Sequence, residues 1–185
     1  MTSRMDRRTA LALLGTGVLG SRLKAAQAHL HAIRKSAEPP HLIFFDDAEH
    51  RLIDTLAEAI IPSDDHSTGA HEARVGYYID LVVGSSAALV QQTWKTEMAG
   101  FNAAAKQDIG KRYLEAGPAA QARFLDKLAS AGAEPKTPAE RFFARMKQIA
   151  IFGYYTSEIG LLKELEYKGN QALAEFPGCG KTDEK

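Results

Sequence analysis

The sequence predicts an all-α fold, a bundle of five to six helices preceded by a signal peptide and a linker. Apolar residues recur at helical spacing from residue 44 onward, and strong helix-start signals stand at Asp46 and Thr137. No segment alternates between polar and apolar residues for long enough to predict a strand. The 185 residues suffice to bury one core without disulfides or a structural metal, so we expect one helical domain over residues 44–166.

Four helices are expected before residue 130, each with its apolar residues on one side. The first follows a capping pair, Asp46 with Glu49, and ends before Pro62. The third spans residues 87–107 and the fourth spans residues 118–130. In chain order, the residues expected to face the core are Leu52, Ile53, Leu56, Ala59 and Ile60; Val75, Tyr78, Ile79, Val82 and Val83; Leu89, Val90, Trp94, Met98 and Phe101; and Phe124, Leu125 and Leu128.

A fifth helix begins at the segment "TPAE", which combines the N-cap Thr137 with a proline at the first helical position and a reciprocal glutamate. It is expected to end after Tyr155, inside "FGYYTSEIG", where a sixth helix starts. Ser157 or Thr156 would cap the sixth helix, with Glu158 in its first turn, where the helix dipole favours a negative charge. Of the two adjacent tyrosines, one ring is expected to pack inward and the other to lie at the surface.

Residues 1–28 predict a twin-arginine (Tat) signal peptide. Adjacent Arg7 and Arg8 precede an apolar run of about a dozen residues, too short to cross a membrane, and then a small-x-small cleavage site with Ala26 and Ala28. The moderate hydrophobicity of this run, and the basic residues after it, favour the Tat route, which exports folded proteins. The alternative is an amphipathic helix that stays on the protein.

Two irregular segments flank the helical domain. Residues 29–43 contain adjacent prolines and little apolar periodicity, which predicts a linker. Residues 167–185 predict an irregular C-terminal arm, because proline and glycine surround Cys179 in "EFPGCGK". Cys179 is the only cysteine of the chain, so in an oxidising compartment it is either a free thiol or half of an intermolecular disulfide.

The sequence carries no cofactor motif. There is no C-x-x-C-H for haem, no G-x-G-x-x-G after a strand and no phosphate-binding loop, and one cysteine alone cannot hold an iron–sulfur cluster. All six histidines lie between residues 29 and 71. Two short patterns in this range could bind a metal ion: His29 with His31, and Asp64-Asp65-His66. The alternatives are a flexible leader and a polar loop. Acidic residues outnumber basic ones after the leader, which argues against a nucleic-acid partner. We expect no cofactor and no metal in this chain.

Three short motifs lie between residues 60 and 179. They are I-I-P-x-D with G-A-x-E-A-x-V in residues 60–75, G-Y-Y-T-S-E-I-G in residues 153–160, and Y-x-G-N with F-x-G-C in residues 167–179. Through them the chain resembles the gluconate 2-dehydrogenase subunit 3 family. The resemblance implies a cofactor-free small subunit whose large partner is a flavoprotein of the glucose-methanol-choline oxidoreductase type. That partner would hold FAD, and a cytochrome c subunit with haem c often completes the complex.

The expected function is therefore a non-catalytic accessory subunit of a periplasmic, FAD-dependent gluconate or sugar dehydrogenase, associated with the inner membrane through the complex. It would assist folding, stability and Tat export of the flavoprotein, which explains a Tat leader on a chain without a cofactor. The C-terminal arm would wrap onto the large subunit, with Cys179 in a disulfide to it. The residues expected to contact the partner are Tyr154, Tyr155, Tyr167, Asn170, Phe176 and Cys179.

Two other functions compete with this one. The first is a stand-alone helical binding protein of the periplasm. The second is an independent hydrolase or metal enzyme that uses Ser157, Glu158 or the histidines. A nucleophilic serine needs a base within hydrogen-bond reach, and no histidine follows residue 71 in the sequence, so capping explains Ser157 better than catalysis does.

Overall fold

The structure is a computed structural model that describes residues 40–130, 132 and 134–169. The chain divides into two compact units, residues Met1–His41 and Leu42–Lys185. The predicted signal peptide and residues 29–39 of the predicted linker lie outside the described residues. The described part of the second unit is helical and contains no strand, so the predicted all-α fold is confirmed.

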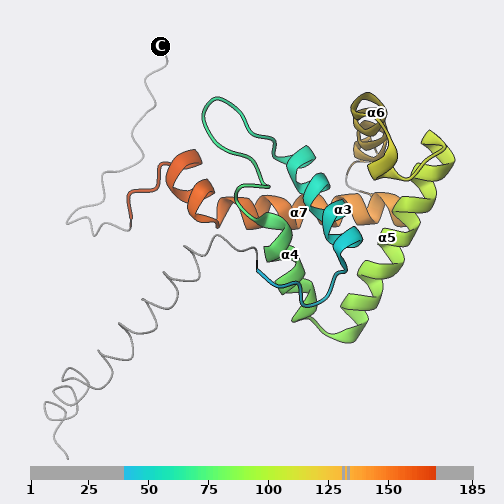
Figure 1. Cartoon of the computed structure of the whole chain (residues 1–185), viewed down its shortest axis with the longest axis horizontal. Helices are drawn as coiled ribbons and strands as arrows, with labels where there is room; N and C mark the ends of the chain where they lie inside the picture. Colours follow the sequence, from blue (N-terminus) through green and yellow to red (C-terminus); the bar gives the residue numbers. More distant parts are fainter. Residues whose placement is uncertain (1–39, 131, 133, 170–185) are drawn as a thin grey trace, which may run out of the picture. The chain divides into compact units, whose positions relative to one another are not determined.

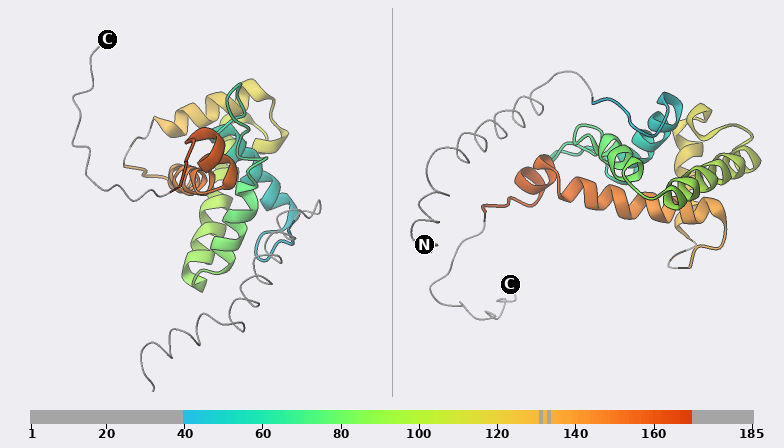
Figure 2. Two further views of the ribbon diagram at one scale, coloured as in Figure 1. Left: turned by 90° about the vertical axis from the view of Figure 1, so that its left-hand side faces the viewer. Right: turned by 90° about the horizontal axis from the view of Figure 1, so that it is seen from below.

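The described part of the second unit holds five α-helices and two short helical turns (Figure 1). The longer elements are α3 (Asp47–Ile60), α4 (Val75–Gly84), α5 (Ala88–Ile109), α6 (Pro118–Ala129) and α7 (Pro138–Tyr155). The 3-10 turn η1 (Tyr113–Glu115) precedes α6, and the short π-helix η2 (Gly160–Glu164) follows α7. Helix α7 packs against α3, α4, α5 and α6, which makes it the central helix of the bundle, as the two further views in Figure 2 also show.

Helices α3 and α7 begin where the sequence predicts, each with a complete capping box. The Asp46 carboxylate accepts hydrogen bonds from the backbone N–H groups of Ala48 and Glu49 at 2.9 and 2.8 Å, and Glu49 accepts one in return from the Asp46 N–H. Thr137 and Glu140 form the same reciprocal pair at the start of α7. Each box satisfies N–H groups that a helix start leaves without an intrahelical partner.

The core is centred on aromatic rings contributed by successive elements. The ring of Phe101 on α5 lies 5.4 Å from that of Tyr113 in η1, and 5.3 Å from those of Phe124 on α6 and Phe142 on α7, measured between centroids. All four side chains are buried. Because aromatic rings in this arrangement exclude water and attract one another edge to face, this cluster joins α5, α6 and α7.

Three residues expected to face the core do not. Leu89 is 79% exposed and Val90 is 39% exposed, and Ala59 near the end of α3 is exposed as well. Burial on α5 begins at Trp94, since the first turns of this helix extend past the core. Apolar spacing predicts which side of a helix is apolar, but it does not show where the neighbouring helices stop.

A buried carboxylate attaches the chain before α3 to α4. Asp80 on α4 accepts hydrogen bonds from the backbone N–H groups of Ile43, Phe44 and Phe45 at 2.7, 3.1 and 2.8 Å. Its side chain is buried. The end of the predicted linker, at Ile43, is therefore part of the compact helical unit.

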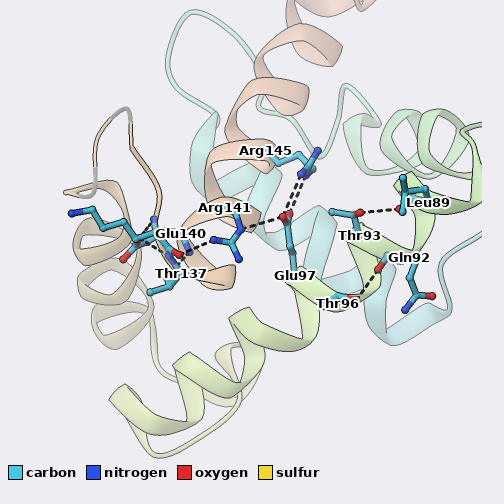
Figure 3. A network of polar contacts seen from close by, with 10 residues as sticks. Leu89, Gln92, Thr93, Thr96, Glu97, Thr137, Glu140, Arg141 and Arg145 are labelled. Atoms are coloured by element: carbon cyan, nitrogen blue, oxygen red, sulfur yellow. Dashed lines mark hydrogen bonds and ion pairs between the residues drawn. The ribbon is translucent and has the colours of Figure 1, made fainter.

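A second buried carboxylate links α5 to α7 (Figure 3). Glu97 on α5 accepts two hydrogen bonds from the guanidinium of Arg145, at 3.0 and 3.3 Å, and lies 3.6 Å from that of Arg141. Both arginines are on α7. Because a buried carboxylate is stable only when it is well paired, this contact fixes how α5 crosses α7.

Candidate partner-binding site

The first motif segment folds as a loop between α3 and α4, held by a single glutamate. The two carboxylate oxygens of Glu58 on α3 accept hydrogen bonds from the N–H of Ser63 at 3.1 Å and the N–H of His71 at 2.8 Å. A Cβ at Gly69 would lie 2.5 Å from the same carboxylate and 2.6 Å from the backbone nitrogen of Ser63, so the close packing of this loop requires glycine at this position. Glu58 thereby fixes both ends of the loop.

Asp64 shapes the tip of this loop. Its Oδ1 accepts hydrogen bonds from the N–H groups of His66 at 2.9 Å and Ser67 at 2.8 Å. These bonds favour the ionised carboxylate and hold the pKa of Asp64 below its ordinary value, with the bond from Ser67 as the largest cause. These hydrogen bonds within its own turn explain why an aspartate stands at position 64 without a metal ion.

Tyr154 joins the first motif to the second. It is 2% exposed, and its hydroxyl donates to the backbone carbonyl of Thr68 at 2.8 Å and lies 2.6 Å from the hydroxyl of Ser67. Two segments more than 80 residues apart in the sequence therefore meet through one buried side chain. Tyr154 is one of the predicted partner contacts, but it presents almost no surface to a partner and instead supports the exposed residues beside it.

Two glycines allow close packing around the second motif. A Cβ at Gly153 would lie 2.7 Å from the ring of Tyr78 on α4, and a Cβ at Gly160 would lie 2.1 Å from the backbone carbonyl of Tyr154. The second distance is far below any real carbon contact with backbone. The start of η2 therefore packs against the end of α7 only with glycine at position 160.

Ser157 caps the turn after α7, as the sequence predicts. Its hydroxyl accepts a hydrogen bond from the N–H of Gly160 at 3.0 Å and donates one to the backbone carbonyl of Tyr154 at 2.6 Å. The hydroxyl proton thus points to a carbonyl and is not shared with a base. The predicted helix break after Tyr155 is confirmed, but the element that follows is a short π-helix, not an ordinary α-helix.

The exposed part of the site is apolar. Tyr155 is 37% exposed and Tyr167 is exposed as well, so these predicted partner contacts lie at the surface. Tyr155 also lines a half-open groove of about 550 Å³ between the first loop, α6, α7 and η2. Its walls combine apolar side chains with four charged residues, Asp64, Asp126, Lys147 and Glu164.

The histidines do not assemble into a metal centre in the described part of the chain. No group of three or more His, Cys, Asp or Glu side chains there has metal-binding geometry. His71 instead pairs with Asp54 at 2.5 Å, and this hydrogen bond is the largest cause that raises the pKa of His71 above its ordinary value. His50 is buried against the ring of Tyr77 at 4.4 Å between centroids.

Several predicted site residues lie outside the described residues: Arg7, Arg8, Ala26, Ala28, Asn170, Phe176 and Cys179. The pairing of Tyr154 with Ser67 and Thr68 was not predicted, because nothing in the sequence near either segment indicates which distant residue it meets. The role of Glu58 was missed for the same reason. Gly69 could have indicated the contact with α3, because glycine often occurs where the backbone packs closely against another segment.

The motifs of residues 60–75 and 153–160, which meet at this site, lie within the part of the chain that matches a known family. The family model for gluconate 2-dehydrogenase subunit 3 matches residues 47–178, most of the chain and nearly all of the described helical unit. The chain belongs to the gluconate 2-dehydrogenase subunit 3 family. Neither the curated proteins nor the solved structures gave a match.

Membership of the gluconate 2-dehydrogenase subunit 3 family identifies the chain as a subunit of a dehydrogenase complex. Within the described ranges, no helix combines the length and the apolar character needed to cross a membrane. The family match continues past Gly169, the last described residue, as far as Gly178. The family domain therefore includes most of the predicted C-terminal arm.

Proposed function

We propose that this chain is a non-catalytic accessory subunit of a periplasmic FAD-dependent gluconate or sugar dehydrogenase. The observation that supports it most is that the polar side chains of the motifs form hydrogen bonds within the protein. Tyr154, Ser67 and Ser157 direct their hydroxyls at one another or at backbone groups, and the surface beside them is apolar. A catalytic site needs free polar groups that converge on a substrate, whereas a surface that binds a partner needs apolar side chains on a rigid support.

In this proposal the redox chemistry belongs to the other subunits. The large partner is a flavoprotein of the glucose-methanol-choline oxidoreductase type that holds FAD, and a cytochrome c subunit with haem c can complete the complex. The small subunit stabilises the flavoprotein and carries the Tat signal, with Arg7 and Arg8, for both chains. The absence of cofactor motifs in the sequence and the paired arginines support this division of roles.

The C-terminal arm is proposed to lie on the large subunit, with Cys179 in a disulfide to it. The family match extends to residue 178, which supports a role for most of this segment in the family domain. Non-reducing gels of the native complex test the bridge, with Cys179→Ser as the control. A band of the combined mass that reductant splits is expected. Separate bands without reductant, together with a Cys179 that reacts freely with a thiol reagent, would contradict it.

Purification from the native host tests the proposal as a whole. A tagged chain is expected to bring with it a polypeptide that shows a flavin spectrum and oxidises gluconate or another sugar with an artificial electron acceptor. The same chain expressed alone is expected to be colourless and inactive. Flavin or haem absorption in the chain alone, or sugar oxidation by it, would contradict the proposed role.

The alternative of a stand-alone binding protein gives a different result in the same experiment. In that case the tagged chain would be recovered without a flavoprotein, and the sugar-oxidising activity would remain in another fraction. The hydrolase alternative has less support, because the proton of the Ser157 hydroxyl is bonded to a carbonyl.

A further inference from the structure

Two neighbouring hollows in the described part of the chain join into one long groove beside α7. The first is the half-open groove of about 550 Å³, and the second has a volume of about 210 Å³. Four residues line both hollows, and we call the joined hollow the α6–α7 groove: Ala129, Phe143, Lys147 and Ile151. Along α7 the lining residues run from Glu140 to Tyr155, which is about 22 Å at about 1.5 Å per residue.

The shape of the α6–α7 groove suits a polypeptide segment. A small-molecule site usually encloses most of the surface of its ligand, whereas both parts of this groove are half-open. An extended polypeptide rises about 3.3 Å per residue, so about seven residues span the length of the groove. Successive side chains of such a segment point to opposite sides, so one set faces the floor of the groove and the other faces its rim or the solvent.

The floor of the groove is apolar and already in place before anything binds. Leu125 on α6 and Phe143 on α7 line it, and each is only 8% exposed, because most of the side chain packs into the core. At one end of the floor Tyr154 is held by its hydrogen bonds to Ser67 and Thr68. A surface that is fixed in advance loses little conformational entropy when an apolar side chain covers it.

The charges around this floor are mostly negative. Against the one ammonium of Lys147 stand four carboxylates, which gives the lining side chains a net charge of −3: Asp64, Asp126, Glu140 and Glu164. Asp64 and Glu140 accept hydrogen bonds from backbone N–H groups. Among the described residues, Asp126 and Glu164 have no ion-pair partner. A lysine or arginine side chain is therefore attracted to this rim, and another carboxylate is repelled.

We propose that the α6–α7 groove binds an extended basic segment of the flavoprotein large subunit. Apolar side chains of that segment lie against Leu125 and Phe143, and its lysine or arginine side chains lie beside Asp126 and Glu164. The family is named for a subunit, which makes a polypeptide the expected ligand, and the length, floor and charge of the groove define the chemistry of the segment. This inference rests on the proposed function, because the large subunit supplies the segment.

The first experiment tests the charge of the groove by measuring Kd between the purified small subunit and the flavoprotein. Every small-subunit chain carries Cys179→Ser, so that only non-covalent contacts are measured. Asp126→Lys with Glu164→Lys reverses both unpaired charges, and Asp47→Lys with Glu72→Lys is the matched control, since these two acids are exposed and do not line the groove.

We expect Kd without charge reversal to rise at least about fivefold between about 50 mM and about 300 mM NaCl, because salt screens the attraction at the rim. Charge reversal in the groove should raise Kd at least about 30-fold at the lower salt concentration and remove most of the salt dependence. The control pair should change Kd less than about threefold and keep the salt dependence.

The second experiment fills the groove without changing its charge. Ala129 is exposed on α6 and lines both hollows, so Ala129→Trp places an indole ring where the segment is proposed to lie. Ala122→Trp is the control, because Ala122 is exposed on the same helix and outside the groove. We expect Ala129→Trp to raise Kd at least about tenfold and Ala122→Trp to change it less than about twofold.

Thermal melts of each variant alone establish that it folds, and the charge test and the filling test each stand if a variant of the other does not fold. Groove variants that bind as tightly as their controls would overturn this inference and leave the proposed function intact. A Kd that is independent of salt without charge reversal would overturn the basic character of the segment, even if Ala129→Trp weakens binding. Dimers of the small subunit that Ala129→Trp dissociates, with an unchanged flavoprotein affinity, would assign the groove to a second copy instead. A small subunit that binds no flavoprotein at all would overturn the proposed function itself.

Discussion

Asp80 holds the backbone at the start of the described helical unit. Its buried carboxylate accepts three backbone N–H groups, from Ile43, Phe44 and Phe45. Asp80→Ala leaves these donors without their partner, so we expect the free energy of unfolding to fall by about 3 kcal/mol. Urea unfolding measures it. Asp108→Ala is the control, because Asp108 pairs with Lys127 at the surface and should cost less than about 1 kcal/mol. Equal effects of the two substitutions would contradict the role of Asp80.

His71 gives the stability of the chain a small dependence on pH. Its hydrogen bond to Asp54 raises the pKa of His71 in the folded state, so the pair stabilises the fold fully below about pH 6.5, the ordinary histidine value. That stabilisation is lost as the pH rises through the raised pKa. The pair is solvent-screened, so we expect less than about 1 kcal/mol.

The difference in unfolding free energy between wild type and His71→Gln tests this pH dependence. It is expected to be larger at about pH 6 than at about pH 9, because the stabilisation falls as the pH rises through the raised pKa of His71. In an Asp54→Asn background the substitution should lose this pH dependence, because the main cause of the raised pKa is gone. A difference that is the same at both pH values would show that the His71–Asp54 pair adds no stability.

Sequence reasoning could predict local residue roles but not long-range ones. The caps at Asp46, Thr137 and Ser157 were predicted because each cap bonds to residues within four positions of itself. Tyr154 bonds across 86 residues to Thr68, and no local pattern contains that information. The division of the tyrosine pair into one buried and one exposed ring was predicted from helical phase, but not which buried groups the inward ring would meet.

At the scale of elements, the junction between α7 and η2 is expected to act as a cap and not as a catalytic centre. Ser157→Ala removes the bond from the N–H of Gly160, so we expect the free energy of unfolding to fall by about 1 kcal/mol. The turnover of the assembled complex should change little. Thermal melts and turnover are to be measured on the same preparation. A large loss of turnover with an unchanged melting temperature would favour a catalytic role for Ser157.

The helices themselves were largely predictable, since α3, α5, α6 and α7 all begin within about one to two residues of the predicted positions. Proline, capping boxes and apolar spacing mark such boundaries directly. The π-helix η2 was not predicted, because apolar residue spacing does not distinguish a short π-helix from the last turn of an α-helix. The exposed start of α5, with Leu89, was also missed, since the same apolar spacing occurs whether or not a neighbour covers it.

At the scale of the whole molecule, the first two motifs, residues 60–75 and 153–160, come together in the described part of the helical unit. The first motif forms the loop that Glu58 holds, and the second supplies Tyr154, which binds that loop, and Gly160, which lets η2 pack beside it. The result is a rigid support under an exposed apolar surface. This arrangement fits the accessory role proposed above, because an interface formed on a rigid support loses less conformational entropy on binding.

The export of two chains by one signal is the central claim of the proposed function, and cell fractionation tests it most directly. Arg7 and Arg8 are both replaced by lysine, which keeps the charge but removes the paired guanidinium groups that the Tat route recognises. The small subunit and the flavoprotein are then followed together in the cytoplasmic and periplasmic fractions. Retention of both polypeptides in the cytoplasm is the expected result. A flavoprotein that still reaches the periplasm in the double variant would contradict the claim that this chain carries it.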